Sequence, residues 1–343
     1  MTEAHRAVGV AFPPLETRRD VVVDSAVRAE ELGYDAFFVA EGWGLDALVL
    51  LAEIATKTER IALGTCVLSV WSRSGGTLAM AAATLSQISG SRFTLGLGAS
   101  TPQLVEGFHD VAFASPVDQM RRVVTQVREL LAGNRVPLSR TDQARPLRLG
   151  ASAEPVPIFL AGLAPASARL SGEIADGWMP TFVPVSRTDQ MLRVLEQGTK
   201  VRSQEGPCRF CPAITTAVAA DDARARELAA WWLGFYLTSM GPIYPRMLEW
   251  LGLGAEVKAL QAANPTRSAF TVPPEASVLL DDIVIFGTPE AARDRLARWY
   301  EVGADLPILC LPPNLPRDEI DVALCALAPG SAPDSKPGKT IEP

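Results

Sequence analysis

Residues 61–98 read IALGTCVLSVWSRSGGTLAMAAATLSQISGSRFTLGLG and contain two short apolar runs on either side of a longer segment. The runs Ile61–Val67 and Phe93–Gly98 are apolar throughout instead of alternating, which is typical of parallel strands buried on both faces. Between them, Thr77–Ser89 repeats its apolar residues at helical spacing and stops at Gly90. The stretch therefore predicts a strand, a helix and a second strand.

The same order of strand and helix recurs along the chain. The apolar runs are Ala7–Phe12, Asp35–Ala40, Ile61–Val67, Phe93–Gly98, Pro157–Ala161, Gly177–Pro180, Cys208–Ala219 and Leu306–Leu311. Helical spacing follows most of them, at residues 17–32, 46–57, 77–89, 116–132, 165–175, 187–203 and 288–300. Ser115 precedes Pro116 and is the expected N-cap of its helix. Eight such units favour closure into a barrel, so the fold class is α/β, a (β/α)8 TIM barrel.

An open, doubly wound sheet is the alternative fold. It normally carries a glycine-rich turn after the first strand, where a pyrophosphate approaches the backbone. Here that turn reads Phe12-Pro13-Pro14-Leu15 and has no glycine. The barrel is therefore favoured.

Three segments depart from the regular order. Residues 221–263 are mostly helical, rich in large apolar side chains and longer than one crossover requires, which predicts a helical insertion near strand 7. Residues 134–155 contain Pro and Arg and predict an excursion on the surface. We expect residues 1–328 to form a single barrel domain, and residues 329–343, which have no apolar period, to be a disordered tail.

Composition excludes several classes of protein. With 32 Lys and Arg against 39 Asp and Glu the formal charge is −7, which argues against nucleic-acid binding through phosphate neutralisation. The longest uncharged stretch, residues 74–91, contains too much Ser, Thr, Gln and Gly for a membrane span. The N-terminal residues lack the apolar stretch of a signal peptide. We expect a cytoplasmic protein with no nucleic-acid or membrane partner.

The cysteines do not form a disulfide or metal pattern. There are five, an odd and widely spread set, which suits reduced thiols. The spacing of Cys208 and Cys211 suggests a redox or zinc site. In a strand, however, residues three apart point to opposite faces, so these two thiols would not act together. With only His5 and His109 in the chain, packing is the favoured role, and we expect no metal site.

In a barrel of this kind, active groups occupy the loops after the strands. Here those positions are mostly apolar, aromatic or glycine, which suits a flat apolar ligand such as an isoalloxazine-type ring better than hydrolysis. Residues 161–165 (AGLAP) join a strand to a helix N-terminus, where backbone N–H groups favour a phosphate. A simple tight turn is the competing interpretation of that segment. Residues 96–101 (GLGAST) are small, so a ligand could approach the backbone closely here as well. The alternative is that these small residues only fill a crowded barrel rim.

Four stretches together resemble one family. They are residues 31–61, 61–100, 156–180 (VPIFLAGLAPASARLSGEIADGWMP) and 286–309 (FGTPEAARDRLARWYEVGADLPIL). In order and content they are similar to the luciferase-like flavin- or deazaflavin-dependent oxidoreductases, over about residues 7–312. The turn AEGWG at 40–44 and STPQLVEGFH at 100–109 are most similar to the branch that uses coenzyme F420, an 8-hydroxy-5-deazaflavin. The resemblance implies a (β/α)8 barrel with an insertion near strand 7, and a homodimer.

The resemblance also implies roles for particular residues. A non-prolyl cis peptide bond under the cofactor ring matches Cys66–Val67. Ser100 and Thr101 match positions at the ring or ribityl chain. Further positions match the phosphate-binding turn and an acidic residue beside the cofactor; these are Gly162, Leu163 and Ala164 for the turn, and Glu41 for the acid.

One departure from the family pattern concerns proton transfer. Several relatives carry a His directly after the acidic position, where this chain has Gly42. Glu41 and Glu106 are the remaining catalytic candidates, with Thr101 or Tyr244 as hydroxyl donors. Each of these has a purely structural alternative. Arg73 either pairs with the anionic end of the cofactor or is a solvated charge. The expected substrate-pocket residues are Phe12, Trp43 and Phe182.

Three functions remain open. The favoured one is a coenzyme F420-dependent oxidoreductase that transfers a hydride between the deazaflavin ring and a small organic substrate. The second is an FMN-dependent luciferase-like monooxygenase. The third is a non-catalytic member that binds a cofactor or a partner.

Overall fold

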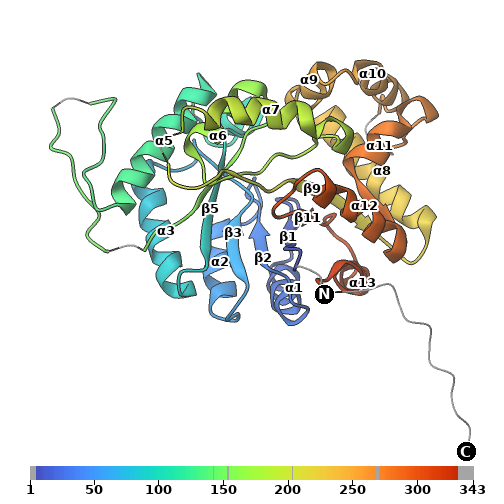
Figure 1. The fold of residues 1–343 in the computed structure, drawn as a ribbon, viewed down its shortest axis with the longest axis horizontal. Helices are drawn as coiled ribbons and strands as arrows, with labels where there is room; N and C mark the ends of the chain where they lie inside the picture. The colour runs from blue at the N-terminus through green and yellow to red at the C-terminus, as the bar shows by residue number, and fades with distance from the viewer. Residues whose placement is uncertain (1–4, 142, 153, 203, 267–269, 331–343) are drawn as a thin grey trace, which may run out of the picture.

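The computed structural model describes residues 5–141, 143–152, 154–202, 204–266 and 270–330. In this part of the chain, parallel strands form the centre of the molecule and helices surround them (Figure 1). The strands of the ring are β1 Gly9–Phe12, β2 Ala36–Val39, β3 Ala62–Thr65, β5 Phe93–Gly98, β6 Ile158–Ala161, β7 Gly177–Trp178, β8 Arg209–Phe210, β9 Ala213–Val218 and β11 Ile308–Cys310. Each begins and ends within a few residues of an apolar run in the sequence.

The sheet closes on itself. β8 and β9 are two parts of one stretch separated by Cys211 and Pro212; β8 pairs with β7, and β9 pairs with β11. β11 then pairs with β1, so the path of neighbours returns to the first strand. Every one of these pairs is parallel. The (β/α)8 barrel predicted from the sequence is confirmed, and the open-sheet alternative is wrong.

Helices cover the outside of the ring. They are α1 Arg19–Glu31, α2 Ala47–Ala55, α3 Gly75–Ser89, α5 Pro116–Leu131, α6 Pro165–Ile174, α7 Thr188–Thr199, α12 Pro289–Glu301 and α13 Arg317–Leu327. Their apolar faces and the strands enclose one large core, which contains Leu51, Leu78 and Met120. A second cluster, which includes Phe38, Phe159 and Met179, belongs to the strands. The ring is thus packed on both faces, as its uniformly apolar strands require.

The predicted insertion lies between β9 and β11. It contains α8 Asp222–Ser239, α9 Ile243–Trp250, α10 Gly254–Ala263, α11 Ser277–Ile283 and the short strand β10 Ile285–Gly287, which pairs with β9. These helices have an apolar cluster of their own, around Leu233, Leu248 and Leu280. In Figure 1 they form the yellow and orange part of the molecule at the right.

The structure tests the expectation for residues 134–155, but it does not test most of the expectation for the tail at residues 329–343. Between α5 and β6 the described residues form no helix or strand, and this segment extends away from the barrel at the left of Figure 1, as the sequence predicts. Of the expected disordered tail, residues 331–343 lie outside the described residues, and the expectation for them stays a prediction.

Cys208 and Cys211 point to opposite faces of their strand segment, as expected. Cys211 belongs to the cluster formed by the strands, whereas Cys208 packs against the core beneath the outer helices. Burial raises the pKa of the Cys208 thiol to about 12, and it raises the pKa of Cys211 as well. Both thiols are therefore protonated at neutral pH and pack as small apolar groups.

Candidate functional site

A cavity of about 430 Å³ lies where the strands of the barrel end. Its wall is contributed by the residues that follow β1, β2, β3, β5, β6 and β7, and by α8 and α9 of the insertion. The wall is mostly apolar and aromatic. It therefore occupies the place in the fold where barrel enzymes bind their ligands.

The segment after β3 forms part of the cavity wall. β3 ends at Thr65, the chain resumes as β4 Leu68–Ser69 beside β5, and between them the Cys66–Val67 peptide bond is cis. Cys66 N donates to Val39 O (3.0 Å), which ties the interruption to β2. The cis bond implied by the resemblance is present at the expected position, and both residues line the cavity.

Thr65 and Gly96 hold this interruption against β5. The sequence indicated Gly96 as one of the small residues at 96–101, but it did not indicate Thr65. Gly96 N donates to Thr65 Oγ1 (2.9 Å), and the same hydroxyl donates to Gly96 O (2.8 Å). A Cβ on Gly96 would lie 1.8 Å from Thr65 O, so only glycine fits here. The pattern GLG in the sequence indicates a close backbone approach at Gly96. That Thr65 of β3 is its partner follows only from the folded structure.

Glu41 is fixed by two hydrogen bonds from Arg73. Arg73 Nη1 donates to Glu41 Oε1 (2.5 Å) and Nη2 donates to Oε2 (2.8 Å), while Nη2 also donates to Asp46 Oδ2 (2.6 Å). The Glu41 side chain is only 10% exposed. The hydrogen bond from Arg73 to Glu41 is the largest contribution that raises the pKa of Arg73. Glu41 lines the cavity as an ion-paired carboxylate, and Arg73 is neither solvated nor free for another anion.

The segment after β5 contains two residues predicted to contact the cofactor, which line the cavity, and one predicted catalytic residue, which does not. Ser100 and Thr101 line the cavity, and Thr101 Oγ1 accepts from Leu104 N (3.4 Å) at the start of α4 Pro102–Gly107. Glu106 lies farther along α4, is exposed and accepts from Phe113 N (3.0 Å). It is not among the residues of the cavity wall, so the geometry gives the catalytic expectation for Glu106 no support.

Of the three residues predicted to bind phosphate in the turn between β6 and α6, two line the cavity and one does not. Leu163 and Ala164 line the cavity, together with Ser167 in the first turn of α6. Ala164 is the N-cap residue of α6 and makes no side-chain capping bond, so the first N–H groups of this helix lack that partner. Gly162 faces away: its carbonyl accepts from Trp178 Nε1 (2.7 Å), and it is not part of the wall.

Aromatic residues close the other side of the cavity. Trp232 and Tyr236 of α8 and Tyr244 of α9 line it. Burial raises the pKa of Tyr244 to about 12, and that of Tyr236 well above its usual range. Both phenols are therefore neutral at physiological pH.

The three expected substrate-pocket residues have different positions. Phe12 and Trp43 line the cavity. Phe182 does not: it is buried behind the tyrosines, with ring centroids 4.7 Å from Tyr236 and 5.2 Å from Tyr244. Its contribution is to support these rings.

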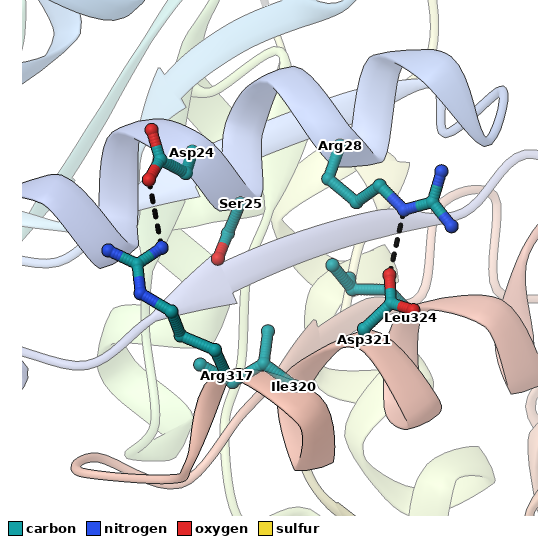
Figure 2. Close-up of a pocket in the computed structure, with 7 residues that line it drawn as sticks. All are labelled: Asp24, Ser25, Arg28, Arg317, Ile320, Asp321 and Leu324. Carbon is teal, nitrogen blue, oxygen red and sulfur yellow. Dashed lines mark hydrogen bonds and ion pairs between the residues drawn. The ribbon is translucent and has the colours of Figure 1, made fainter.

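A second, smaller cavity of about 120 Å³ lies between α1 and α13 (Figure 2). Its charged residues already pair with one another across the two helices. Arg317 Nη1 donates to Asp24 (2.8 Å), and Arg28 Nε donates to Asp321 (2.7 Å). These ion pairs connect the first and last helices of the described chain and leave this cavity without a spare charge of its own.

Neither a cluster of metal ligands nor a membrane-spanning helix is present among the described residues. No group of three or more His, Cys, Asp or Glu in this part of the chain could hold a metal ion. No helix among these residues is both long and apolar enough to cross a bilayer.

Comparison with known proteins places this geometry in a family. The family model described as luciferase-like monooxygenase matches residues 8–306. The chain belongs to this family. Among curated relatives of this luciferase-like chain is a protein of Mycobacterium tuberculosis that carries the name of a coenzyme F420-dependent oxidoreductase. The two are 30% identical over 307 residues, which cover 82% of this chain and 88% of the relative.

Solved structures of the luciferase-like fold resemble the barrel over nearly its whole length. The coenzyme F420-dependent tetrahydromethanopterin reductase of Methanopyrus kandleri superposes with a TM-score of 0.73, at 17% identity, covering 95% of this chain and 98% of that one. The oxygenating constituent of 3,6-diketocamphane monooxygenase of Pseudomonas putida, in complex with FMN, gives 0.67 at 19% identity, with 95% and 97% covered. These similarities establish the fold.

Proposed function

We propose that this chain is a coenzyme F420-dependent oxidoreductase that transfers a hydride between the deazaflavin ring and a small organic substrate. The observation that carries the proposal is the cavity of about 430 Å³ at the ends of the strands, with apolar walls and an uncapped helix N-terminus at one edge. The curated relative named for coenzyme F420, which the chain matches over most of both lengths, supports this cofactor.

The residues present fit such a cofactor. The cavity lies within the range of about 300–1,000 Å³ that is usual for cofactor pockets. At Gly98 a Cβ would lie 2.8 Å from Val67 Cγ2, so the absence of a side chain keeps the wall beside Val67 open. Cys66, Val67, Ser100 and Thr101 would hold the ring and its chain, with the β6–α6 turn at the phosphate. When bound, the deazaflavin supplies two-electron hydride chemistry.

The chain's own residues then orient ligands and exclude water. The apolar and aromatic wall keeps the site dry, which strengthens every polar interaction inside it. Glu41 is a positioning residue, because both of its oxygens are engaged by Arg73. Tyr236 and Tyr244 are neutral donors in the wall, so either can hold a proton at a substrate oxygen.

An FMN-dependent monooxygenase is the second candidate function. The family description and the superposition on an FMN-bound oxygenating protein favour it. Both cofactors carry a tricyclic ring, so the choice between them is a matter of affinity and of reactivity with oxygen.

A titration of the purified protein separates the two candidates. Quenching of cofactor fluorescence is followed for F420 and for FMN, and oxygen consumption is recorded with each reduced cofactor. We expect tighter binding of F420 and little oxygen consumption. Preferential binding of FMN with rapid oxygen consumption would favour the monooxygenase, and absence of binding to both would favour a non-catalytic protein.

Two expectations from the sequence stay predictions. The chain is expected to form a homodimer, which light scattering on the purified protein measures. It is also expected to act in the cytoplasm, which fractionation of cells that express it tests.

A further inference from the structure

The two charged residues of the cavity wall differ in whether their side chains have a partner. Glu41 and Arg246 are the two residues in the wall of this cavity whose side chains are charged at neutral pH. Glu41 already has a partner, because Arg73 donates to both of its oxygens and also to Asp46. The guanidinium of Arg246 has no such partner, so it is a positive charge beside the cavity that no carboxylate of the described residues engages.

Arg246 lies on α9 and has no partner among the described residues. Its guanidinium makes no hydrogen bond, ion pair or ring contact with any residue in this part of the chain. Glu249, which lies three residues further along the same helix, does not pair with it although this spacing permits such pairs. Arg246 is exposed, so a group bound to it would sit at the solvent edge of the cavity.

The expected phosphate of the cofactor has another place to bind. The β6–α6 turn, with Leu163, Ala164 and Ser167, belongs to the barrel. Arg246 belongs to the insertion, among the residues that close the cavity from the other side. With the cofactor phosphate assigned to that turn, Arg246 is left for another anion.

The wall near Arg246 is apolar and aromatic. Trp232, Tyr236 and Met240 of α8 and the segment after it, and Ile243 at the start of α9, all line the cavity. A molecule that satisfies both features has an apolar body for the cavity and one anionic group at its end. Arginine suits such a group, because its guanidinium binds carboxylate and phosphate oxygens in pairs.

We propose that Arg246 binds the anionic group of the substrate, and that the substrate is an apolar organic acid whose body occupies the cavity beneath α8 and α9. This inference rests on the proposed function in assigning the anion to a substrate. The charge and its surroundings are independent of which cofactor binds.

A pair of fluorescent probes tests the inference without knowledge of the substrate. 1-Anilinonaphthalene-8-sulfonate carries an anionic group on an apolar body, and N-phenyl-1-naphthylamine has the same rings without the sulfonate. Both are titrated into the wild-type protein, Arg246→Gln and Arg226→Gln. Arg226 is the matched control: it is an exposed arginine of α8 that does not line the cavity and has no partner among the described residues. Circular dichroism and thermal unfolding establish that the variants are folded.

The expected result is a selective loss. Arg246→Gln should weaken binding of the sulfonate probe about ten-fold, the usual effect of removing a charge-assisted hydrogen bond. The neutral probe should bind all three proteins equally, and Arg226→Gln should bind both probes like the wild type. An unchanged sulfonate affinity in Arg246→Gln, or an equal loss in both variants, would overturn the proposal.

A parallel titration with F420 distinguishes a substrate anion from a cofactor anion. If Arg246 serves the substrate, Arg246→Gln binds F420 as the wild type does. A loss of F420 affinity as large as the loss for the sulfonate probe would assign Arg246 to the cofactor and overturn the inference. Failure of the wild-type protein to bind F420 would count against the proposed function, while the probe titrations would still decide whether Arg246 binds an anion.

Discussion

Gly162 and Ala164 belong to the same turn but have very different surroundings. A Cβ on Gly162 would lie 2.5 Å from Ser167 O, so a side chain there disturbs the backbone of α6 before it reaches any ligand. Ala164 lines the cavity and has the extended backbone of an N-cap residue. The sequence indicated the turn, because a glycine-containing segment joins a strand to a helix. It could not indicate which of its residues face the cavity, since that depends on the hydrogen bond that Trp178 Nε1 donates to the Gly162 carbonyl.

Substitutions at Ala164 separate binding of an anion from stability. Ala164→Asp supplies the missing cap and should stabilise α6 by about 1 kcal/mol. The same charge should weaken F420 binding about ten-fold or more, because it repels the phosphate expected at these N–H groups. Fluorescence quenching and urea unfolding measure the two effects. Ala164→Asn is the control, since it caps the helix without charge and should lose less affinity. Equal affinities for Asp and Asn would remove the turn from the anion site.

Thr65 should be a stabilising residue whose contribution lies in its hydroxyl. Its side chain is fully buried and bonds to both the N–H and the carbonyl of Gly96. Thr65→Val keeps the shape but leaves both groups without that partner, which should cost about 1–3 kcal/mol of unfolding free energy in urea. Thr94→Val on β5 is the matched control: no hydroxyl hydrogen bond is formed by Thr94 within the described chain, and its loss should stay within about 0.5 kcal/mol.

At the scale of whole elements, the spacing of apolar residues predicted the long, regular helices. α3 and α5 were indicated by their spacing, and Gly90 ends α3 with a left-handed φ of 64°. α4 has only six residues, too few to show a helical period. α13 carries buried residues at 320, 323, 324 and 327, a helical spacing that was readable in the sequence but was not recognised. The division of the seventh strand at Cys211 and Pro212 follows from pairing with different neighbours, which no local pattern contains.

Two serines that precede helices should behave differently when mutated. Ser74 caps α3, because its Oγ accepts from Thr77 N (3.1 Å). Ser115 occupies the N-cap position of α5, as predicted, but its backbone is left-handed (φ 49°) and its side chain makes no capping hydrogen bond. Ser74→Ala should lower the unfolding free energy by about 1 kcal/mol, and Ser115→Ala should change it by less than about 0.5 kcal/mol. Thermal and urea unfolding of the two variants measure this difference, and equal losses would contradict the assignment of the caps.

For the molecule as a whole, closure of the barrel brings the two ends of the described chain together. β1 pairs with β11, and the ion pairs between α1 and α13 lie beside that seam (Figure 2). Eight apolar runs were enough to predict closure, because a ring leaves no strand edge exposed. The polar contacts across the seam connect residues almost 300 positions apart, so they could be found only in the folded structure.

Glu16 is the buried charge at this seam, and it should make stability depend on pH. It accepts from Arg18 Nη2 (2.7 Å) and from Asn314 N (2.9 Å), while Arg18 also donates to Leu315 O (2.8 Å). Burial alone would raise the pKa of Glu16, but the hydrogen bonds from Arg18 and Asn314 outweigh it and hold the pKa below the usual 4.5. A lowered pKa in the folded state means that the contribution is fully present above pH 4.5 and is lost as the pH falls through the folded-state value.

Glu16→Gln should therefore lower the unfolding free energy by about 2–4 kcal/mol at pH 7, because it leaves the donors of Arg18 and Asn314 without a charged acceptor. The difference from the wild type should shrink as urea unfolding is repeated below pH 4.5, since protonation removes the same charge from the wild-type protein. Glu31→Gln is the control: it breaks an exposed pair with Arg28 and should cost less than about 1 kcal/mol. A difference that stays constant from pH 7 to pH 3 would show that Glu16 contributes through its shape, and that its charge does not stabilise the closed barrel.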